Sequence, residues 1–355
     1  MKSLVKFGRI ALINVLLVVL LLALLEGGAS LLFTAYQVVR TPGLAEQSYS
    51  RYDETLGWVS LPNANAPDLY GPGVYLRTNS QGFRNDRDFA RAVPVGKIRI
   101  VCSGDSFTLG FGVSNAQAWC ERLGALDPRL ETVNMGQGGY GLDQAYLWYV
   151  RAGAAMDQQV HLFAFITDDF IRMESDRFLG YGKPVLGLRS DSIVVLNRPV
   201  PTTSWFTRWR AVKGHALGNL NMVRLVQKIL RLDERTVPAD TLAARMQRTQ
   251  GLVTRIFENL ARMNREKGSR LVLVYLPGPG DYRTNDLTSK WRRFVESEAQ
   301  RQGIVYLDVV DALRKVPPTD VNELFSPNSH YSVAGNEFVA NTVYKALGPL
   351  IGTRE

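Results

Sequence analysis

A short serine-containing turn and a small number of histidines are the groups in this sequence best suited to nucleophilic chemistry. Ser106 stands in the sequence Gly104-Asp105-Ser106, directly after an apolar run that is typical of a β-strand. A serine on a strand-to-helix turn exposes its hydroxyl, and its own N–H can face the same cleft. A serine nucleophile also requires a base within hydrogen-bonding distance. Because the chain has three histidines, the choice of base is narrow.

The three histidines differ in their sequence contexts. His161 begins an apolar run, at the amino end of an expected strand, and is predicted to be structural. His215 lies in a segment that interrupts the strand–helix alternation. His330 lies in FSPNSHYSVAGNEFVA, a loop that leads into the last expected helix and can fold back over the sheet edge. By elimination, Ser106 and His330 form the best nucleophile and base, while a hydrogen-bonded structural histidine is the alternative interpretation of His330.

Five short apolar runs alternate with helical patterns, which predicts a parallel sheet with helices on both faces. The predicted strands lie in KIRIVCSGDS, ETVNMGQGGYG, VHLFAFITDD, SRLVLVYLPGPG and GIVYLDV. Helices are predicted over 116–126, 142–156, 242–265, 288–302 and 333–347. Sites in such sheets gather at the carboxyl ends of the strands. Ser106, Asn134 and Asp168 follow three of these ends and are expected to cluster there.

Two segments stand outside this alternation. Residues 37–95 form a lead-in region, in which the alternation of VYLRT and the turn residues Asn-Ser-Gln-Gly predict a short hairpin. Residues from about 180 to 240 form an insertion, and VLGLRSDSIVVLNRPVP predicts a second hairpin that turns at Ser190-Asp191-Ser192. The sheet-forming domain is expected to cover 96–350, with this insertion inside it.

The N-terminus carries the pattern of a membrane anchor. The segment 10–36 starts with IALINVLLVVLLLALL and is long enough to span the hydrocarbon layer of a bilayer. Lys2, Lys6 and Arg9 precede it, so residues 1–9 are expected in the cytoplasm and the remaining chain outside it. A cleaved signal peptide is the alternative. Because no clean A-x-A site follows the apolar run, we predict an uncleaved transmembrane anchor.

Composition limits the remaining possibilities. With 46% hydrophobic and 21% charged residues, the chain has the make-up of a globular protein. Its formal net charge of +9 favours a partner with anionic groups, such as a membrane surface or an acidic glycan. The sequence has no dense run of Lys and Arg that would indicate nucleic-acid binding. We expect no metal and no cofactor, because His330 has no second histidine nearby and Asp168 with Asp169 is a poor ligand set. Cys102 and Cys120 could form a disulfide outside the cytoplasm or remain two buried thiols.

Three blocks, SGDSFTLGFGV, NMGQGGYGLDQ and HYSVAGNEFVA, occur in an order and spacing that resembles the SGNH/GDSL hydrolase superfamily. The segments LGW, TNSQGFR and RPVP are similar to patterns of the membrane-anchored bacterial SGNH proteins. The resemblance covers the chain from about Asp53 to its end. It implies a flavodoxin-like α/β/α sandwich, the SGNH hydrolase fold, with a central parallel sheet. It also implies an esterase, lipase or O-acyltransferase, and the anchored members are often associated with extracellular polysaccharide.

Residue by residue, the resemblance places the family nucleophile on Ser106 and the family base on His330. The glycine whose N–H helps to bind the oxyanion falls on Gly139, with Gly138 as the neighbouring possibility. In the mechanism that this implies, His330 accepts the proton of Ser106 while Ser106 attacks an ester carbonyl. The acyl group then passes to water or to a sugar hydroxyl.

Two positions depart from the family pattern. The family's oxyanion-binding asparagine aligns with Asp168, and an ionised carboxylate cannot donate a hydrogen bond. The family acid, two or three residues before the histidine, aligns with Asn328 or Pro327. The side chain of Asn328 could still orient the imidazole by accepting from its ring N–H, and Asp168 or Asp169 could replace the acid in space. Arg172 is expected to pair with Asp168 or Asp169 and so to lower the pKa of its partner.

The sequence therefore predicts a serine esterase or O-acyltransferase anchored by a single span in a bacterial inner membrane, with its C-terminal domain in the periplasm or outside the cell. The expected substrate is an acylated carbohydrate, with acetyl as the expected acyl group, or another small ester. A membrane-bound acyl donor or a protein of a polysaccharide system is the expected partner. The two departures leave a second interpretation open: a catalytically weak or inactive binding module of a polysaccharide biosynthesis or export system.

Overall fold

The computed structural model divides the chain into two compact units, and it describes residues 2–40, 46–178, 181–190, 192–202, 239–283 and 286–352. The first unit contains helix α1 (Lys2–Arg40). Within α1, the segment Lys6–Gly28 is apolar and long enough to cross a membrane, judged by length and composition. The structure therefore agrees with the predicted anchor in two respects: the segment is helical and it is apolar. His215 and most of the predicted insertion lie outside the described residues.

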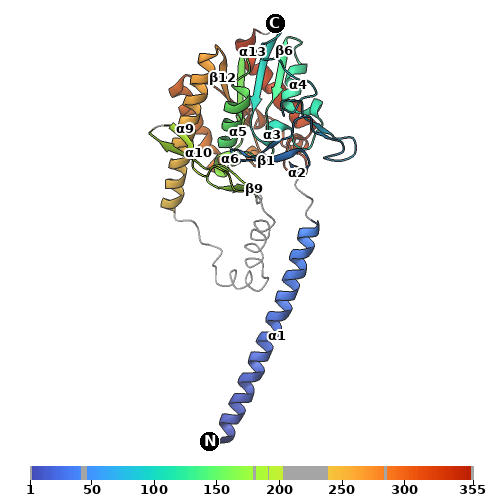
Figure 1. Ribbon diagram of the computed structural model, residues 1–355, viewed down its shortest axis with the longest axis vertical. Helices are drawn as coiled ribbons and strands as arrows, with labels where there is room; N and C mark the ends of the chain where they lie inside the picture. The colour runs from blue at the N-terminus through green and yellow to red at the C-terminus, as the bar shows by residue number, and fades with distance from the viewer. Residues whose placement is uncertain are drawn as a thin grey trace. The chain divides into compact units, whose positions relative to one another are not determined.

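A parallel sheet forms the centre of the second unit (Figure 1). Its strands are β5 (Ile98–Ser103), β6 (Leu130–Asn134), β7 (Val160–Phe165), β12 (Arg270–Tyr275) and β13 (Val305–Asp308). They lie in the order β13-β12-β7-β5-β6, and every neighbouring pair is parallel. Numbered along the chain, this is the 2-1-3-4-5 order of flavodoxin-like sheets. The predicted α/β fold and its five strands are confirmed.

Helices cover both faces of the sheet because the strand side chains are apolar on both sides. Cys102 and Leu162 belong to the core under α4 (Trp119–Ala125) and α13 (Val333–Ile351). Val101 and Phe163 belong to the opposite core, which is covered by α5 (Leu142–Trp148), α9 (Ala239–Glu266) and α10 (Asp286–Gln302). All five predicted helices are therefore present. Cys102 and Cys120 are free and buried, which is the second of the two alternatives for these thiols.

Shorter helices connect these elements. They are α2 (Glu46–Tyr49), α3 (Ser106–Leu109), α6 (Thr167–Arg172), α11 (Val309–Leu313) and α12 (Pro318–Val321). Helix α3 follows β5, and α6 follows β7. Both therefore begin at the carboxyl edge of the sheet, where a site is expected.

The lead-in region folds as two small antiparallel pairs. One joins β1 (Ser50–Asp53) with β2 (Gly57–Ser60), and the other joins β3 (Asn65–Ala66) with β4 (Leu76–Arg77). The hairpin predicted around Asn-Ser-Gln-Gly is therefore wrong in its pairing, because β4 pairs with the strand before it. The side chain of Asn79 closes that loop instead: its Oδ1 accepts from the N–H groups of Gln81 and Phe83 at 3.0 and 2.9 Å.

The described part of the insertion packs against the lead-in region. It contains β8 (Arg177–Phe178), β9 (Tyr181–Gly182), β10 (Leu186–Arg189) and β11 (Ser192–Val195). The pairing of β10 with β11 confirms the second predicted hairpin. Val200 donates its N–H to the carbonyl of Glu54 at 2.8 Å, and Lys183 forms a wholly buried ion pair with Asp143. These two segments therefore form one cover on the sheet domain.

Candidate active site

Ser106 is the first residue of α3, and the turn that carries it is fixed by its two preceding residues. Asp105 caps the helix, because its Oδ1 accepts from the N–H of Phe107 at 2.9 Å. Asp105 is therefore a turn carboxylate that accepts a backbone hydrogen bond. A Cβ on Gly104 would lie 2.5 Å from the carbonyl oxygen of Ala164, so only glycine fits there. As the first helical residue, Ser106 has no partner within the helix for its own N–H.

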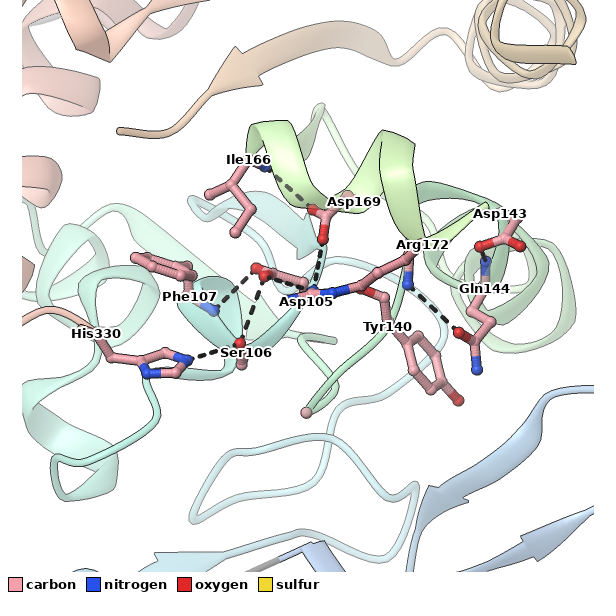
Figure 2. A network of polar contacts seen from close by, with 12 residues as sticks. Asp105, Ser106, Phe107, Tyr140, Asp143, Gln144, Ile166, Asp169, Arg172 and His330 are labelled. Atoms are coloured by element: carbon pink, nitrogen blue, oxygen red, sulfur yellow. Dashed lines mark hydrogen bonds and ion pairs between the residues drawn. The ribbon is translucent and has the colours of Figure 1, made fainter. Parts of the chain in front are cut away.

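His330 reaches Ser106 from the loop before α13, as the sequence predicted (Figure 2). Its Nε2 lies 2.9 Å from the hydroxyl oxygen of Ser106, and its Nδ1 lies 3.1 Å from the main-chain oxygen of Asn328. A carbonyl oxygen can only accept, so Nδ1 must carry the ring proton when the imidazole is neutral. The unprotonated Nε2 then faces the serine hydroxyl. This is the tautomer that a general base requires.

Two aromatic rings flank the imidazole of His330. The ring centroid of Phe107 lies 4.8 Å from that of His330, and the centroid of Phe111 lies 4.6 Å from it. Burial lowers the pKa of His330 below its ordinary value, while the nearby charge of Asp105 acts in the opposite direction. A lowered pKa keeps the imidazole neutral, and therefore basic, near pH 7. The blocks contain both phenylalanines, but neither was predicted to belong to the site.

The position of Asn328 corrects one prediction. Its side chain does not hold the imidazole: Oδ1 accepts from the hydroxyl of Ser326 and, at 3.3 Å, from the main-chain N–H of His330. The main-chain carbonyl of Asn328 accepts from the ring instead. The side chain closes the loop, and the backbone orients the base. Residue type alone could not distinguish these two arrangements.

A buried charge network lies on the other side of Ser106 (Figure 2). The Oδ2 atom of Asp105 lies 3.4 Å from the hydroxyl oxygen of Ser106 and 3.4 Å from Nη1 of Arg172. The same Nη1 lies 2.8 Å from Oδ1 of Asp169 and donates to the carbonyl of Tyr140 at 2.9 Å. One guanidinium therefore joins α6, the nucleophile turn and the glycine loop.

The acidic residues of α6 differ from one another. The predicted ion pair of Arg172 is confirmed with Asp169, but the prediction that this pair lowers the pKa of Asp169 is wrong. Burial raises the pKa of Asp169 well above its ordinary value, and the charge of Asp105 raises it further, despite the opposing effect of Arg172. Asp168 is exposed to solvent. Neither carboxylate hydrogen-bonds to His330 within the described residues, so neither replaces the missing acid behind the ring.

The glycine loop after β6 has a left-handed backbone and leaves no room for a side chain at Gly139. Gly139 has φ of +73°, and a Cβ there would lie 2.5 Å from the ring of Phe178. Its N–H has no acceptor within the described part of the chain. Gly138 turns its carbonyl to the indole N–H of Trp58 at 2.8 Å. Asn134 supports the loop, because its Oδ1 accepts from the N–H of Gly136 at 3.0 Å.

Arg84, from the lead-in region, holds the loop that follows α3. Its wholly buried guanidinium donates to the carbonyls of Leu109, Gly110 and Val113, and to Oδ1 of Asn115 at 3.0 Å. Arg84 was not among the residues predicted to belong to the site. The available signal was the segment TNSQGFR itself, whose arginine follows a glycine turn.

His161 is structural, as predicted. Its ring stacks on that of Tyr149, with 3.7 Å between the centroids, and its Nδ1 lies 3.2 Å from the amide nitrogen of Asn264. Burial lowers its pKa well below the ordinary value, so the ring is neutral. It lies at the amino end of β7 and contributes to the core rather than to the site.

No family model and no curated protein matches the chain. Three solved structures with a similar fold are an acetyl xylan esterase, a lipase/acylhydrolase from Enterococcus faecalis and a member of the lipolytic protein G-D-S-L family from Veillonella parvula. Their sequence identities are 12%, 14% and 13%, and their TM-scores are 0.43, 0.39 and 0.40. The alignments cover 70%, 73% and 70% of this chain and 100%, 100% and 97% of those chains. Because these likenesses are distant, the interpretation of the site depends on its geometry.

Proposed function

We propose that this protein is a membrane-anchored serine hydrolase of the SGNH type that cleaves or transfers acyl esters. One observation carries the proposal: the hydroxyl oxygen of Ser106 lies 2.9 Å from Nε2 of His330. This nitrogen is unprotonated in the neutral ring, because the carbonyl of Asn328 holds the ring proton on Nδ1. A serine with such a base is an activated nucleophile. The lowered pKa of His330 supports the same role, since the base is then neutral at physiological pH.

The reaction follows from this pair. Ser106 attacks the ester carbonyl while its proton passes to Nε2 of His330, and the carbonyl oxygen becomes an oxyanion. The main-chain N–H groups of Ser106 and Gly139 are the proposed donors to that oxyanion. The imidazolium then gives its proton to the departing alcohol, leaving an acyl-serine. Water, or a sugar hydroxyl, loses a proton to His330 and attacks the acyl-serine. The imidazolium returns this proton to the oxygen of Ser106 as the acyl–oxygen bond breaks, which releases the acid or a new ester.

The substrate and location rest on the sequence resemblance and on α1. We propose an acetylated carbohydrate as the substrate and a bacterial inner membrane as the site of anchoring. The apolar segment Lys6–Gly28 supports a single span, and the basic residues Lys2, Lys6 and Arg9 at its N-terminal end favour a periplasmic sheet domain. A membrane-bound acyl donor or a protein of a polysaccharide system is the proposed partner for acyl transfer.

The test uses the full chain in detergent micelles, with a fluorophosphonate probe and p-nitrophenyl acetate as reagents. We expect covalent labelling and hydrolysis by the native chain, and no labelling of the Ser106→Ala variant. His330→Ala should lower kcat/KM by about a thousandfold or more, because a nucleophile and its base act as a unit. The matched control is Ser326→Ala, which removes a hydroxyl close to His330 but leaves the nucleophile intact. Labelling that persists in Ser106→Ala would exclude Ser106 as the nucleophile.

A binding module without turnover is the second candidate. It is favoured by the exposed side chain of Asp168, where the family has an oxyanion donor, and by the absence of a carboxylate against the ring nitrogen of His330 among the described residues. The two candidate functions can be separated in cells that carry Ser106→Ala, by measuring acylation and export of a surface polymer. Unchanged acylation and export would favour the binding module.

A further inference from the structure

The imidazolium that forms during attack lacks its usual partner in this site. In a Ser-His-Asp triad the acid both orients the imidazole and stabilises its positive charge. Here the carbonyl of Asn328 orients the ring but carries no formal charge. The oxyanion and the imidazolium then develop with no anion behind the ring. Another carboxylate close to the reacting atoms would have to supply that stabilisation.

We propose that Asp105 supplies this negative charge, from the serine side of the imidazole rather than from behind it. The inference rests on the proposed function. Figure 2 shows the carboxylate of Asp105 between the hydroxyl of Ser106 and the guanidinium of Arg172. Its Oδ2 lies 3.4 Å from the hydroxyl oxygen of Ser106, which itself lies 2.9 Å from Nε2 of His330. The protonated ring and the carboxylate are therefore separated by one oxygen atom.

The surroundings of Asp105 hold the carboxylate in this position. Its side chain is wholly buried, and its Oδ1 accepts from the N–H of Phe107. The charged and titratable groups that face it are Arg172 and Asp169 from α6, and His330 and Tyr331 from the loop before α13. Burial raises the pKa of Asp105 above its ordinary value, although Arg172, the N–H of Phe107 and His330 each oppose this rise. In return, the charge of Asp105 raises the pKa of His330.

Asp105 is thus assigned two functions through one side chain. As a helix cap it shapes the nucleophile turn, and as an anion it stabilises the imidazolium. These functions can be separated by substitution, because asparagine caps helices about as well as aspartate but has no charge. Asp105→Asn therefore removes the charge and retains the acceptor for the N–H of Phe107.

The experiment measures the rate of fluorophosphonate inactivation and kcat/KM for p-nitrophenyl acetate between about pH 5 and pH 9, with the full chain in detergent. The neutral base is the active form, so both rates rise with pH through the pKa of His330. For Asp105→Asn we expect the plateau of kcat/KM to fall about 10- to 100-fold. The rise should also move to lower pH, because the anion that raised the pKa of His330 is gone. A purely structural Asp105 could lower the plateau but would leave the midpoint in place.

The matched control is Asp308→Asn. Asp308 also caps a short helix, accepting from the N–H of Val310 at 3.0 Å, and it also pairs with an arginine, Arg292. It is not among the groups that shift the pKa of His330. We expect its pH profile to match that of the native chain. Asp105→Ser, another neutral helix cap, serves if Asp105→Asn does not fold.

The outcomes distinguish this inference from the function on which it rests. If the native chain shows no labelling that depends on Ser106, the proposed function itself fails. If the native chain is labelled but folded Asp105→Asn keeps both the plateau and the midpoint, only the role of Asp105 is refuted. A lower plateau with an unchanged midpoint would also refute it, and would leave Asp105 a structural cap.

Discussion

At the scale of single residues, a base held by a main-chain carbonyl depends little on the side chain attached to that carbonyl. The ring N–H of His330 donates to the main-chain carbonyl of Asn328. A residue of any other type at position 328 would supply the same oxygen. The amide side chain contributes only the closure of the loop, through Ser326 and the N–H of His330.

This arrangement predicts a mild effect of Asn328→Ala. We expect kcat/KM for p-nitrophenyl acetate to fall less than about tenfold, since the carbonyl remains and only the loop contacts of net worth about 1 kcal/mol each are lost. The decrease in kcat/KM of His330→Ala, measured in the same assay, shows how much activity is lost when the base is absent. A loss after Asn328→Ala as large as that after His330→Ala would mean that the side chain orients the imidazole after all.

The sequence predicted the contacting pair in this site but not the contacts behind it. Ser106 and His330 could be found because the chain has few histidines, and because Ser106 follows an expected strand while His330 precedes the last expected helix. The role of the Asn328 backbone was invisible, because every residue carries the same carbonyl. The contact of Asp105 with Ser106 depends on a side-chain rotamer, which spacing does not specify.

At the scale of elements, Arg84 couples the lead-in region to the helix that carries the nucleophile. An arginine in a polar loop is usually solvated, so its burial could not be inferred from the loop composition. The strands were predictable for the opposite reason: β5, β7 and β12 are short runs rich in apolar residues that are buried on both faces. A loop that contributes a single buried cation contains no such run of apolar residues.

Replacing this cation should therefore damage both stability and activity. Arg84→Met removes the charged donor from the carbonyls of Leu109, Gly110 and Val113, which we expect to cost on the order of 3 kcal/mol or more. The loop after α3 should then shift and lower kcat/KM even in molecules that remain folded. Thermal unfolding followed by circular dichroism, and activity measured well below the unfolding temperature, check both effects.

Arg99 provides the matched control for this experiment. It is also wholly buried, and its guanidinium donates to the carbonyls of Ala90, Arg91 and Ala92. These contacts lie at the amino end of β5, away from the nucleophile turn. Arg99→Met should lower the unfolding temperature similarly but preserve kcat/KM per folded molecule. Equal activity losses in the two variants would show that Arg84 acts through global stability alone.

At the scale of the whole molecule, α1 sets where the chemistry would take place. An apolar helix preceded by Lys2, Lys6 and Arg9 should insert with those residues in the cytoplasm. We expect the expressed protein to resist extraction from membranes by alkaline carbonate. Its sheet domain should be digested by protease added to spheroplasts but not to intact cells. Protection in spheroplasts would reverse the proposed orientation.

The control replaces the three basic residues with glutamine, as Lys2→Gln, Lys6→Gln and Arg9→Gln together. Their removal takes away the charge bias that orients the helix, while its apolar length is unchanged. We expect the triple variant to remain in the membrane fraction but to show a mixture of orientations. A uniform orientation in this variant would mean that other features of the chain decide it.

The joint cover formed by the lead-in region and the insertion has a practical consequence for anyone who wishes to crystallise the protein. Tyr52 donates its hydroxyl to the carbonyl of Val200, and Arg151 of the sheet domain pairs with Asp53 at 2.6 Å. Trimming the chain to the start of β5 would strip this seam and expose the apolar surface beneath Trp58. A water-soluble version should instead be cut between α1 and α2, so that it keeps every residue that seals the domain.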